Sequence, residues 1–247
     1  MHVISQKALR EFTKEHADAA APLSAWLKLM RRGRFRSFAE LKRTFASVDL
    51  VPTKGRDFHV FNIGGNKYRL VAAIHFNTQR LFVRHILTHP EYRKVKKMKL
   101  RTAAKPMKNP GPREPFLAIR TEREYDAAVE RLNSLVNELG DNPKDPRYRL
   151  IETLSVLIGA YDREHHSLPE ASSIEVIRFL MEEHGLTQKD LPEIGSQGVV
   201  SEILAGRRAL NVRQIQTLAA RFGVDPGAFL TMGGGARLAR RERHSVA

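Results

Sequence analysis

The sequence predicts an α+β fold, in which a small domain of N-terminal helices packed on an antiparallel sheet is followed by an all-α half. Two observations predict it. Apolar residues recur at helical spacing up to about residue 45 and then alternate between residues 57 and 87. After a proline-rich stretch, helical spacing returns and continues to about residue 230. Helices and strands followed by helices alone indicate an α+β domain joined to a helical one.

The first elements are expected to be helices. Ile4, Leu9 and Phe12 recur at helical spacing, and Pro22 is expected to open a second helix. Gly33 is expected to end that helix, because glycine readily adopts the conformations found at helix ends.

Three strands are then expected to form a meander. They are Asp57–Ile63, Lys67–Phe76 and Arg80–Leu87. Gly64-Gly65-Asn66 is a hairpin signal, because glycine tolerates the positive φ of tight turns. Strict alternation puts one set of side chains on one sheet face, namely Leu70, Ala72, Ile74 and Phe76, and the other set opposite, namely Arg69, Val71, Ala73 and His75.

The spacing of apolar residues predicts only helices in the second half. Helical spacing predicts Glu122–Leu139 and Tyr148–Glu164, and a third set begins at Ser172. The expected organisation is a domain over 1–95, a linker or chain junction over 96–115, a helical region over 116–170, a second helical unit over 171–232 and a disordered tail over 233–247.

Charge is unevenly distributed along the chain. The net charge is +15, and residues 1–105 hold 23 lysines and arginines against 7 acidic residues. Such a field favours a polyanion. The chain has no cysteine, which excludes disulfides and thiolate chemistry, and no apolar run is long enough for a membrane span. We therefore expect a cytoplasmic protein with no membrane contact.

The region 172–230 carries a repressor pattern. Leu186-Thr187-Gln188, Leu204-Ala205-Gly206-Arg207-Arg208 and Phe222-Gly223-Val224 lie in register with the Xre/Cro-type helix-turn-helix family, which this region resembles. The resemblance implies operator DNA as a ligand and a homodimer that binds two half-sites. By position, the residues implied at DNA are Gln188, Gln197, Gly198, Ser201, Glu202, Arg207 and Arg208.

The basic half resembles a second family. Val60–Val71 and Thr88-His89-Pro90-Glu91-Tyr92 resemble HigB-type toxins of the RelE-like group, and Asp190–Ser196 resembles HigA-type antitoxins. The resemblance implies a toxin that cleaves messenger RNA on the ribosome. It also implies an antitoxin that blocks the toxin and represses its operon.

The candidate site residues suit RNA cleavage without a metal or cofactor, which needs proton transfer and stabilisation of the phosphorane charge. Arg69 and Arg84, on neighbouring strands, are assigned charge stabilisation. His89 is assigned as general acid or base, and Tyr92 is expected to orient the substrate or share proton transfer. Which of the two transfers the proton stays open. Asn66 and Lys67 are expected to bind the RNA backbone.

Other interpretations stay open. The two arginines could be ordinary sheet-surface residues, His89 could cap a turn, and Tyr92 could belong to the core. His59 and His75 are expected to be structural, and His165-His166 lacks partners at metal-ligand spacing. The alternative functions are a DNA-binding regulator whose basic half binds RNA without cleaving it, and a general RNA-binding protein.

An inhibitory contact is also expected. Residues 113–170 hold 12 acidic against 8 basic residues, which is complementary in sign to the basic half. We therefore expect this region to cover the basic site, so that the ribonuclease is inhibited in this chain.

Overall fold

The structure is a computed structural model that describes residues 1–53, 56–97, 118–140 and 142–230. In the N-terminal half the elements are β1 (His2–Ile4), α1 (Lys7–Glu15), η1 (Ala17–Ala19), α2 (Ala20–Arg32), α3 (Phe38–Thr44), β2 (Asp49–Thr53), β3 (Arg56–Ile63), β4 (Tyr68–His75), β5 (Arg80–Thr88) and α4 (His89–Lys97). In the C-terminal half they are α5 (Glu122–Leu139), α6 (Tyr148–His165), α7 (Ser173–His184), η2 (Gln188–Asp190), α8 (Gln197–Leu204), α9 (Val212–Phe222) and η3 (Pro226–Phe229).

The N-terminal half is built on one sheet with the strand order β1-β5-β4-β3-β2. The three expected strands form the antiparallel centre, joined by the expected hairpin turn, in which Gly64, Gly65 and Asn66 all have positive φ. The α+β class is therefore confirmed. The expected alternation on β4 also holds, since Leu70, Ala72 and Ile74 lie in one apolar cluster while Val71 and Ala73 lie in others.

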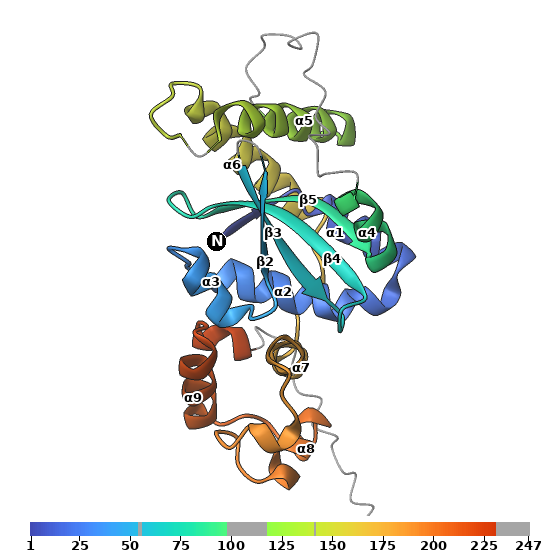
Figure 1. The fold of residues 1–247 in the computed structure, drawn as a ribbon, viewed down its shortest axis with the longest axis vertical. Coiled ribbons are helices and arrows are strands. Elements are labelled where there is room, and N and C mark those ends of the chain that lie inside the picture. The colour runs from blue at the N-terminus through green and yellow to red at the C-terminus, as the bar shows by residue number, and fades with distance from the viewer. Residues whose placement is uncertain (54–55, 98–117, 141, 231–247) are drawn as a thin grey trace, which may run out of the picture.

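Both faces of the sheet are covered, so all eight residues of β4 are buried. Helices α1 and α2 pack on the face of Leu70 and Ala72. The opposite face, which we call the arginine face, is covered by α5, α6 and α4 (Figure 1). Its members on β4 and β5 are Arg69, Val71, Ala73, His75, Arg80, Phe82, Arg84, His85 and Leu87.

The two outer strands were not expected from the sequence. We expected Ile4 to be helical, but it lies in β1, which pairs in parallel with β5, and α1 begins only at Lys7. With only three residues, β1 is too short for periodicity to distinguish a strand from a helix. Val3 and Ile4 are buried on opposite faces of the sheet, and this alternation of consecutive side chains is typical of a strand. At the other edge β2 pairs with β3 and tolerates Pro52, as edge strands do.

The helix ends follow from capping. Helix α2 ends at Gly33 as expected, and α5 begins with a reciprocal capping box between Thr121 and Glu124. Helix α4 continues to Lys97, past the expected boundary at residue 95. The rest of the expected linker and the tail over 233–247 lie outside the described residues.

The element that follows α7 is short. After Thr187 the chain makes only the 3₁₀ turn η2. Pro192 explains this, because a proline disfavours the α conformation in the residue before it. The neighbouring helices α7, α8 and α9 are in place, and Gly185 and Gly223 end α7 and α9 in the left-handed conformation.

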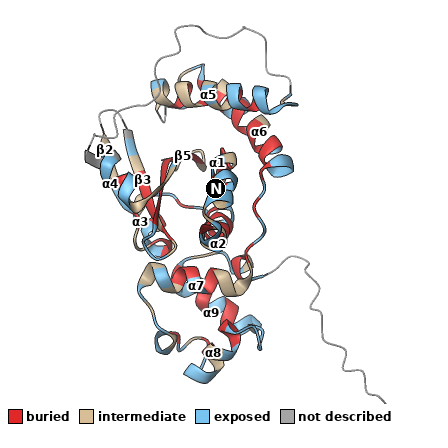
Figure 2. Cartoon of the chain, turned by 90° about the vertical axis from the view of Figure 1, so that its right-hand side faces the viewer, coloured by how far each residue is buried: buried red, intermediate tan, exposed pale blue. Residues whose placement is uncertain are grey.

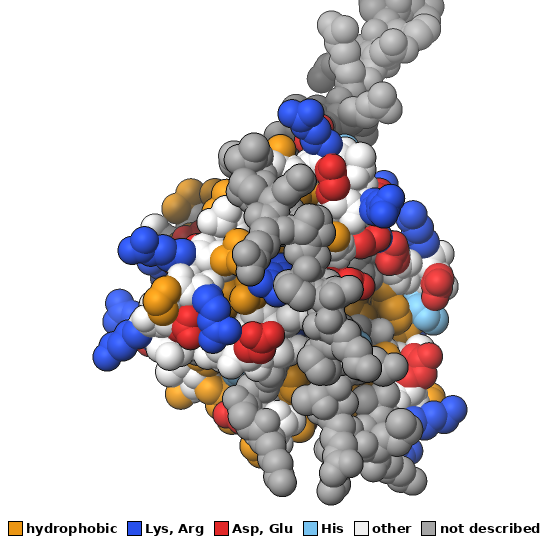
Figure 3. Space-filling model, turned by 90° about the horizontal axis from the view of Figure 1, so that it is seen from above, with side chains coloured by type: hydrophobic (Ala, Val, Ile, Leu, Met, Phe, Trp, Pro, Cys, Tyr) orange, Lys and Arg blue, Asp and Glu red, His pale blue; other side chains and the backbone are white. Residues whose placement is uncertain are grey.

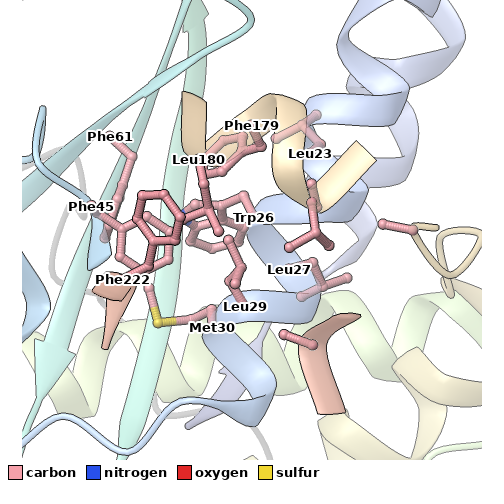
Figure 4. Close-up of a cluster of buried hydrophobic side chains, with 14 of the residues drawn as sticks. Leu23, Trp26, Leu27, Leu29, Met30, Phe45, Phe61, Phe179, Leu180 and Phe222 are labelled. Atoms are coloured by element: carbon pink, nitrogen blue, oxygen red, sulfur yellow. The ribbon is translucent and has the colours of Figure 1, made fainter. Parts of the chain in front are cut away.

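The two halves share a hydrophobic core. Trp26 of α2 and Phe45 lie in the same buried cluster as Phe179 and Leu180 of α7 and Phe222 of α9 (Figure 4). The rings of Phe45 and Phe179 are 6.1 Å apart. The helix-turn-helix is thus packed onto the N-terminal half below the sheet, while α5 and α6 lie above it (Figure 1).

Hydrogen bonds reinforce this shared core. Lys28 Nζ, buried on α2, donates to Ala171 O at 2.8 Å and Leu230 O at 2.7 Å. Thr44 Oγ1 donates to Phe222 O at 3.0 Å, and Ser47 Oγ donates to Glu183 at 2.9 Å. Unfolding one half therefore exposes buried polar groups of the other, which couples the stability of both.

We predict that Phe179→Ala lowers the free energy of unfolding by about 3–5 kcal/mol, because it empties a buried aromatic site. Trp26 is the single tryptophan and is fully buried, so its fluorescence reports on the N-terminal half. The denaturant concentration at the midpoint of the Trp26 fluorescence transition should fall, although the substitution lies in α7. The control Val156→Ala, at a residue that is 60% exposed, should change stability by less than about 0.5 kcal/mol. An unchanged Trp26 transition in the α7 variant would refute the coupling.

Candidate functional site

Arg69 on β4 is fixed by the hairpin turn that precedes it. Its Nη1 donates to Asn66 O at 2.9 Å and Tyr68 O at 3.0 Å, and its Nη2 donates to Asn66 Oδ1 at 2.8 Å. Arg69 is 8% exposed, and burial lowers its pKa, although the charges of Tyr92 and Asp49 act in the opposite direction. The guanidinium is therefore pre-oriented on the arginine face.

Asn66 and Lys67 lie where the sequence placed them, at the hairpin. Asn66 is engaged with Arg69, which makes it a positioning residue for that guanidinium. Lys67 Nζ pairs with Asp18 at 2.9 Å, and Tyr68 Oη donates to the same carboxylate at 2.6 Å. The predicted RNA contacts of Asn66 and Lys67 stay predictions.

A β-bulge interrupts β5 at Arg84. Val71 of β4 pairs with His85, whereas the next residue, Ala72, pairs with Val83, so Arg84 has no opposite residue on β4. Residues directly opposite each other in an antiparallel pair share a face, which puts His85 on the face of Val71. The bulge therefore places both Arg84 and His85 on the arginine face, together with Arg69.

Sequence reasoning missed His85, because strict alternation from Leu81 puts it on the other face. A signal was present in the spacing of apolar residues on β5. Leu81 and Val83 pack with α2, and the next residue to do so is Ile86 rather than residue 85. That shift of one residue marks the bulge.

Arg84 is contacted by the C-terminal half. Its Nη1 donates to Asn133 Oδ1 of α5, and its guanidinium lies 6.0 Å from the centre of the Phe82 ring. Phe82 in turn packs in the apolar cluster that α5 and α6 form over the arginine face. One of the two predicted catalytic arginines is therefore covered by a helix from the other half.

His89 and Tyr92 follow β5 on α4. His89 N donates to Lys67 O at 2.9 Å, and its side chain lines a shallow surface depression of about 410 Å³ with Pro90, Arg93 and Lys94. Tyr92 is 7% exposed and packs on Val60 and Val71 of the arginine face. Burial raises the pKa of Tyr92, and the nearby Asp49 raises it further while Arg69 opposes this. The structure thus brings Tyr92 to Arg69 and leaves His89 past the end of β5.

Helices α5 and α6 meet the N-terminal half through apolar and ionic contacts. Ile4, Ala73 and Phe82 supply the apolar part. Lys7 Nζ lies 2.6 Å from Asp126 and 3.2 Å from Glu122, and Arg80 Nη2 lies 3.4 Å from Glu152. Seen from above, this end of the molecule carries basic and acidic side chains side by side (Figure 3).

Asp162 of α6 anchors this contact. Its carboxylate is fully buried and accepts from Ser5 N at 3.1 Å, from Gln6 N at 3.1 Å and from Tyr125 Oη at 2.7 Å. Burial raises the pKa of Asp162, while these hydrogen bonds act in the opposite direction. Gly159, one turn earlier, permits the close approach, because a Cβ there would overlap the His2 ring.

The predicted DNA-binding residues gather on the helix-turn-helix. Gln197, Gly198 and Glu202 on α8 are exposed, as are Arg207 and Arg208 just after it (Figure 2). Ser201 and Gln188 are half-buried, and Arg208 Nη1 lies 3.7 Å from Glu202. Helix α8 lies at the end of the molecule remote from the sheet (Figure 1), so the N-terminal half leaves these side chains accessible.

His59 and His75 pack in the interior. His59 is 3% exposed between Phe38 and Phe76, and neither ring nitrogen has a hydrogen-bond partner among the described residues. His75 Nδ1 lies 3.2 Å from Tyr148 Oη. Within the described ranges, no cluster of three or more His, Asp or Glu side chains could hold a metal, and none of the helices could cross a membrane.

Comparison with known proteins identifies relatives of each half. Residues 19–95 match the family described as the RelE-like toxic component of a toxin-antitoxin system, and residues 177–229 match a helix-turn-helix family. The antitoxin HigA of Escherichia coli is 38% identical over 125 residues, covering 47% of this chain and 86% of that protein. The mRNA interferase toxin HigB of Escherichia coli is 35% identical over 92 residues, covering 37% and 88%. An mRNA interferase HigB from a second Escherichia coli strain is 30% identical over 95 residues, covering 38% and 91%.

Burial of His59 predicts a pH dependence of stability. Desolvation lowers its pKa from 6.5 to about 4, although Asp57 opposes the shift. Between these values the unfolded chain binds a proton that the folded chain does not, so stability falls as the pH drops from about 6.5 toward 4. Between about pH 6.5 and 4, the free energy of unfolding measured in urea should fall less in His59→Leu than in the unsubstituted chain. The difference should be up to about 3 kcal/mol. Equal pH slopes in both would contradict this assignment.

Proposed function

Because the chain belongs to the HigB family of RelE-like toxins in its N-terminal half and to the HigA family of antitoxins in its C-terminal half, we propose that it is a messenger-RNA endonuclease held inactive by its own antitoxin. The chain is a toxin–antitoxin module with a DNA-binding regulator at its C-terminal end. The comparisons favour this over a regulator that binds RNA without cleaving it. We propose a domain boundary after α4, with residues 1–97 as the toxin and residues from α5 onward as the antitoxin.

The arginine face supports the RNA-cleaving role. Arg69 and Arg84 lie on adjacent strands of one face, where two guanidinium groups can stabilise the charge of one phosphorane. Such charge stabilisation, together with proton transfer, needs no metal, so we propose a metal-independent reaction. Tyr92 packs beside Arg69 and is suited to orient the substrate or share proton transfer, and His89 is the second candidate from the sequence.

One contact carries the proposal of inhibition, namely the hydrogen bond from Arg84 to Asn133. It joins the antitoxin's α5 to a predicted catalytic group, on the face where the scissile phosphate would lie. Helix α6 likewise engages Arg80 through Glu152 on the same face. A side-chain amide oxygen on the guanidinium occupies a position that an RNA phosphate oxygen would need, so RNA and α5 compete.

The helix-turn-helix supports repression by the inhibited form. Helix α8 lies at the end of the molecule remote from the sheet and carries exposed residues, so we propose that the full chain can approach operator DNA without opening. We propose that two chains bind two half-sites about one DNA turn apart, as helix-turn-helix proteins do. Messenger RNA on the translating ribosome is the proposed substrate of the released toxin.

We predict that loosening α5 and α6 activates the enzyme. In the opened chain, defined as the double variant Asn133→Ala/Gly159→Leu, the Arg84 contact is lost and a larger side chain pushes α6 off His2. Cleavage of messenger RNA on translating ribosomes should rise at least about tenfold, which needs only about 1.4 kcal/mol of weakened contact. A chelator should leave the rate unchanged.

Two comparisons make this experiment decisive. Val156→Leu, which enlarges an exposed residue on the same helix as Gly159, should leave the chain inactive. Adding Arg84→Ala to the opened chain should reduce cleavage by about 10²–10³-fold. Faster amide exchange of Ser5 and Gln6, whose N–H groups donate to Asp162, verifies opening. Intact RNA in a chain verified as open would refute the nuclease.

DNA recognition gives a separate prediction, measured by fluorescence anisotropy on DNA selected from a random pool. Arg207→Ala should weaken binding to selected and scrambled DNA alike and reduce the salt slope by about one. Gln197→Ala should cost about 1–3 kcal/mol on the selected sequence only. The control Arg123→Ala removes the same charge from α5, at the other end of the molecule, and should leave both affinities unchanged. Equal losses from Arg123→Ala and Arg207→Ala would contradict the proposed phosphate contact.

A further inference from the structure

Because of the bulge on β5, His85 lies on the arginine face, whereas strict alternation along the strand would put it on the opposite face. His85 follows Arg84 directly and pairs with Val71 of β4. Arg69 pairs with Leu87, two residues beyond His85 on the same face. Diagonal neighbours of this kind lie roughly 7–8 Å apart, within reach of an arginine side chain. The exposed His85 therefore lies on the arginine face between the register positions of Arg84 and Arg69.

His89 is placed less well for the same task. From Arg84 to Thr88 the strand advances four residues, or roughly 13 Å at the usual rise of a β-strand. His89 comes after that, as the first residue of α4, and its side chain lines the depression with Pro90, Arg93 and Lys94. A phosphate oxygen at Arg84 would therefore be nearer to His85 than to His89, although the Arg69 guanidinium points toward the hairpin next to His89.

We propose that His85 is the general base that accepts the proton of the attacking 2′-hydroxyl, in the reaction assigned under the proposed function, on which this inference rests. The 2′-oxygen then bonds to phosphorus, and the bond from phosphorus to the 5′-oxygen breaks. The leaving 5′-oxygen takes a proton from water. The products are a 2′,3′-cyclic phosphate and a 5′-hydroxyl, with Arg69 and Arg84 stabilising the charge on the non-bridging oxygens.

The surroundings of His85 suit a base. Partial desolvation lowers its pKa, and the charge of Arg84 lowers it further, so the ring is neutral at pH 7. The charged and titratable groups on the neighbouring elements are Arg69 on β4, Tyr92 on α4 and Asp49 on β2. Helix α5 presents the neutral amide of Asn133 to Arg84. A bound phosphate would offset the arginine charges when the ring becomes protonated.

The test uses the full-length opened chain, Asn133→Ala/Gly159→Leu, with and without His85→Gln. Glutamine keeps a polar side chain on an exposed strand position but cannot accept a proton near neutral pH. We expect the maximal cleavage rate to fall by at least about 10²-fold, within the range for lost general-base catalysis. The control His165→Gln, at an exposed histidine of α6 outside the arginine face, should leave the rate unchanged. Thermal melting should show that both variants fold.

The pH profile separates a base from a structural residue. A neutral base gives a rate that rises with pH through the pKa of His85, which lies below the usual histidine value, and this limb should vanish in His85→Gln. If the opened chain cleaves RNA and His85→Gln changes neither the rate nor the pH profile, the assignment of His85 is wrong, but the proposed function stands. If a chain verified as open cleaves no RNA at all, the proposed function falls and the assignment falls with it.

Discussion

The buried carboxylate of Asp162 is the interaction on which the arrangement of the two halves depends. It binds the backbone N–H groups of Ser5 and Gln6, at the point where β1 ends and α1 begins. Ser5 has a positive φ there, so the turn presents both donors to one acceptor. Tyr125 of α5 donates to the same carboxylate, which fixes α5 and α6 together on the sheet. Removing the acceptor would leave buried donors unsatisfied, at a cost of about 1–3 kcal/mol each.

From this anchor the antitoxin reaches the toxin on two opposite sides. Helices α5 and α6 cover the arginine face, and α7 and α9 share a core with α2 beneath the sheet (Figures 1 and 4). The first contact covers Arg84, and the second leaves α8 exposed. The proposed inhibition and DNA recognition would therefore use different surfaces of one molecule.

Local chemistry in the sequence was sufficient for much of this fold. The Gly64-Gly65-Asn66 turn, the faces of β4 and the ends of α5 could be predicted, because turn conformation, alternation and capping depend on near neighbours. Strand β1 and the bulge at Arg84 could not, since each is decided by burial against distant segments. The same limit applied to the site. Its arginines could be proposed from the sequence, but the contact from Arg84 to Asn133 could not, because it joins residues far apart in the chain.

The presence of toxin and antitoxin in one polypeptide changes how the proposed inhibition would respond to dilution. Two separate chains would dissociate as their concentration fell, but α5 and the arginine face meet at an effective concentration set by the chain between them. An opened molecule therefore recloses at a rate independent of how many copies the cell contains. Stoichiometry is also fixed at one to one, so an excess of toxin cannot arise from unequal synthesis of two partners.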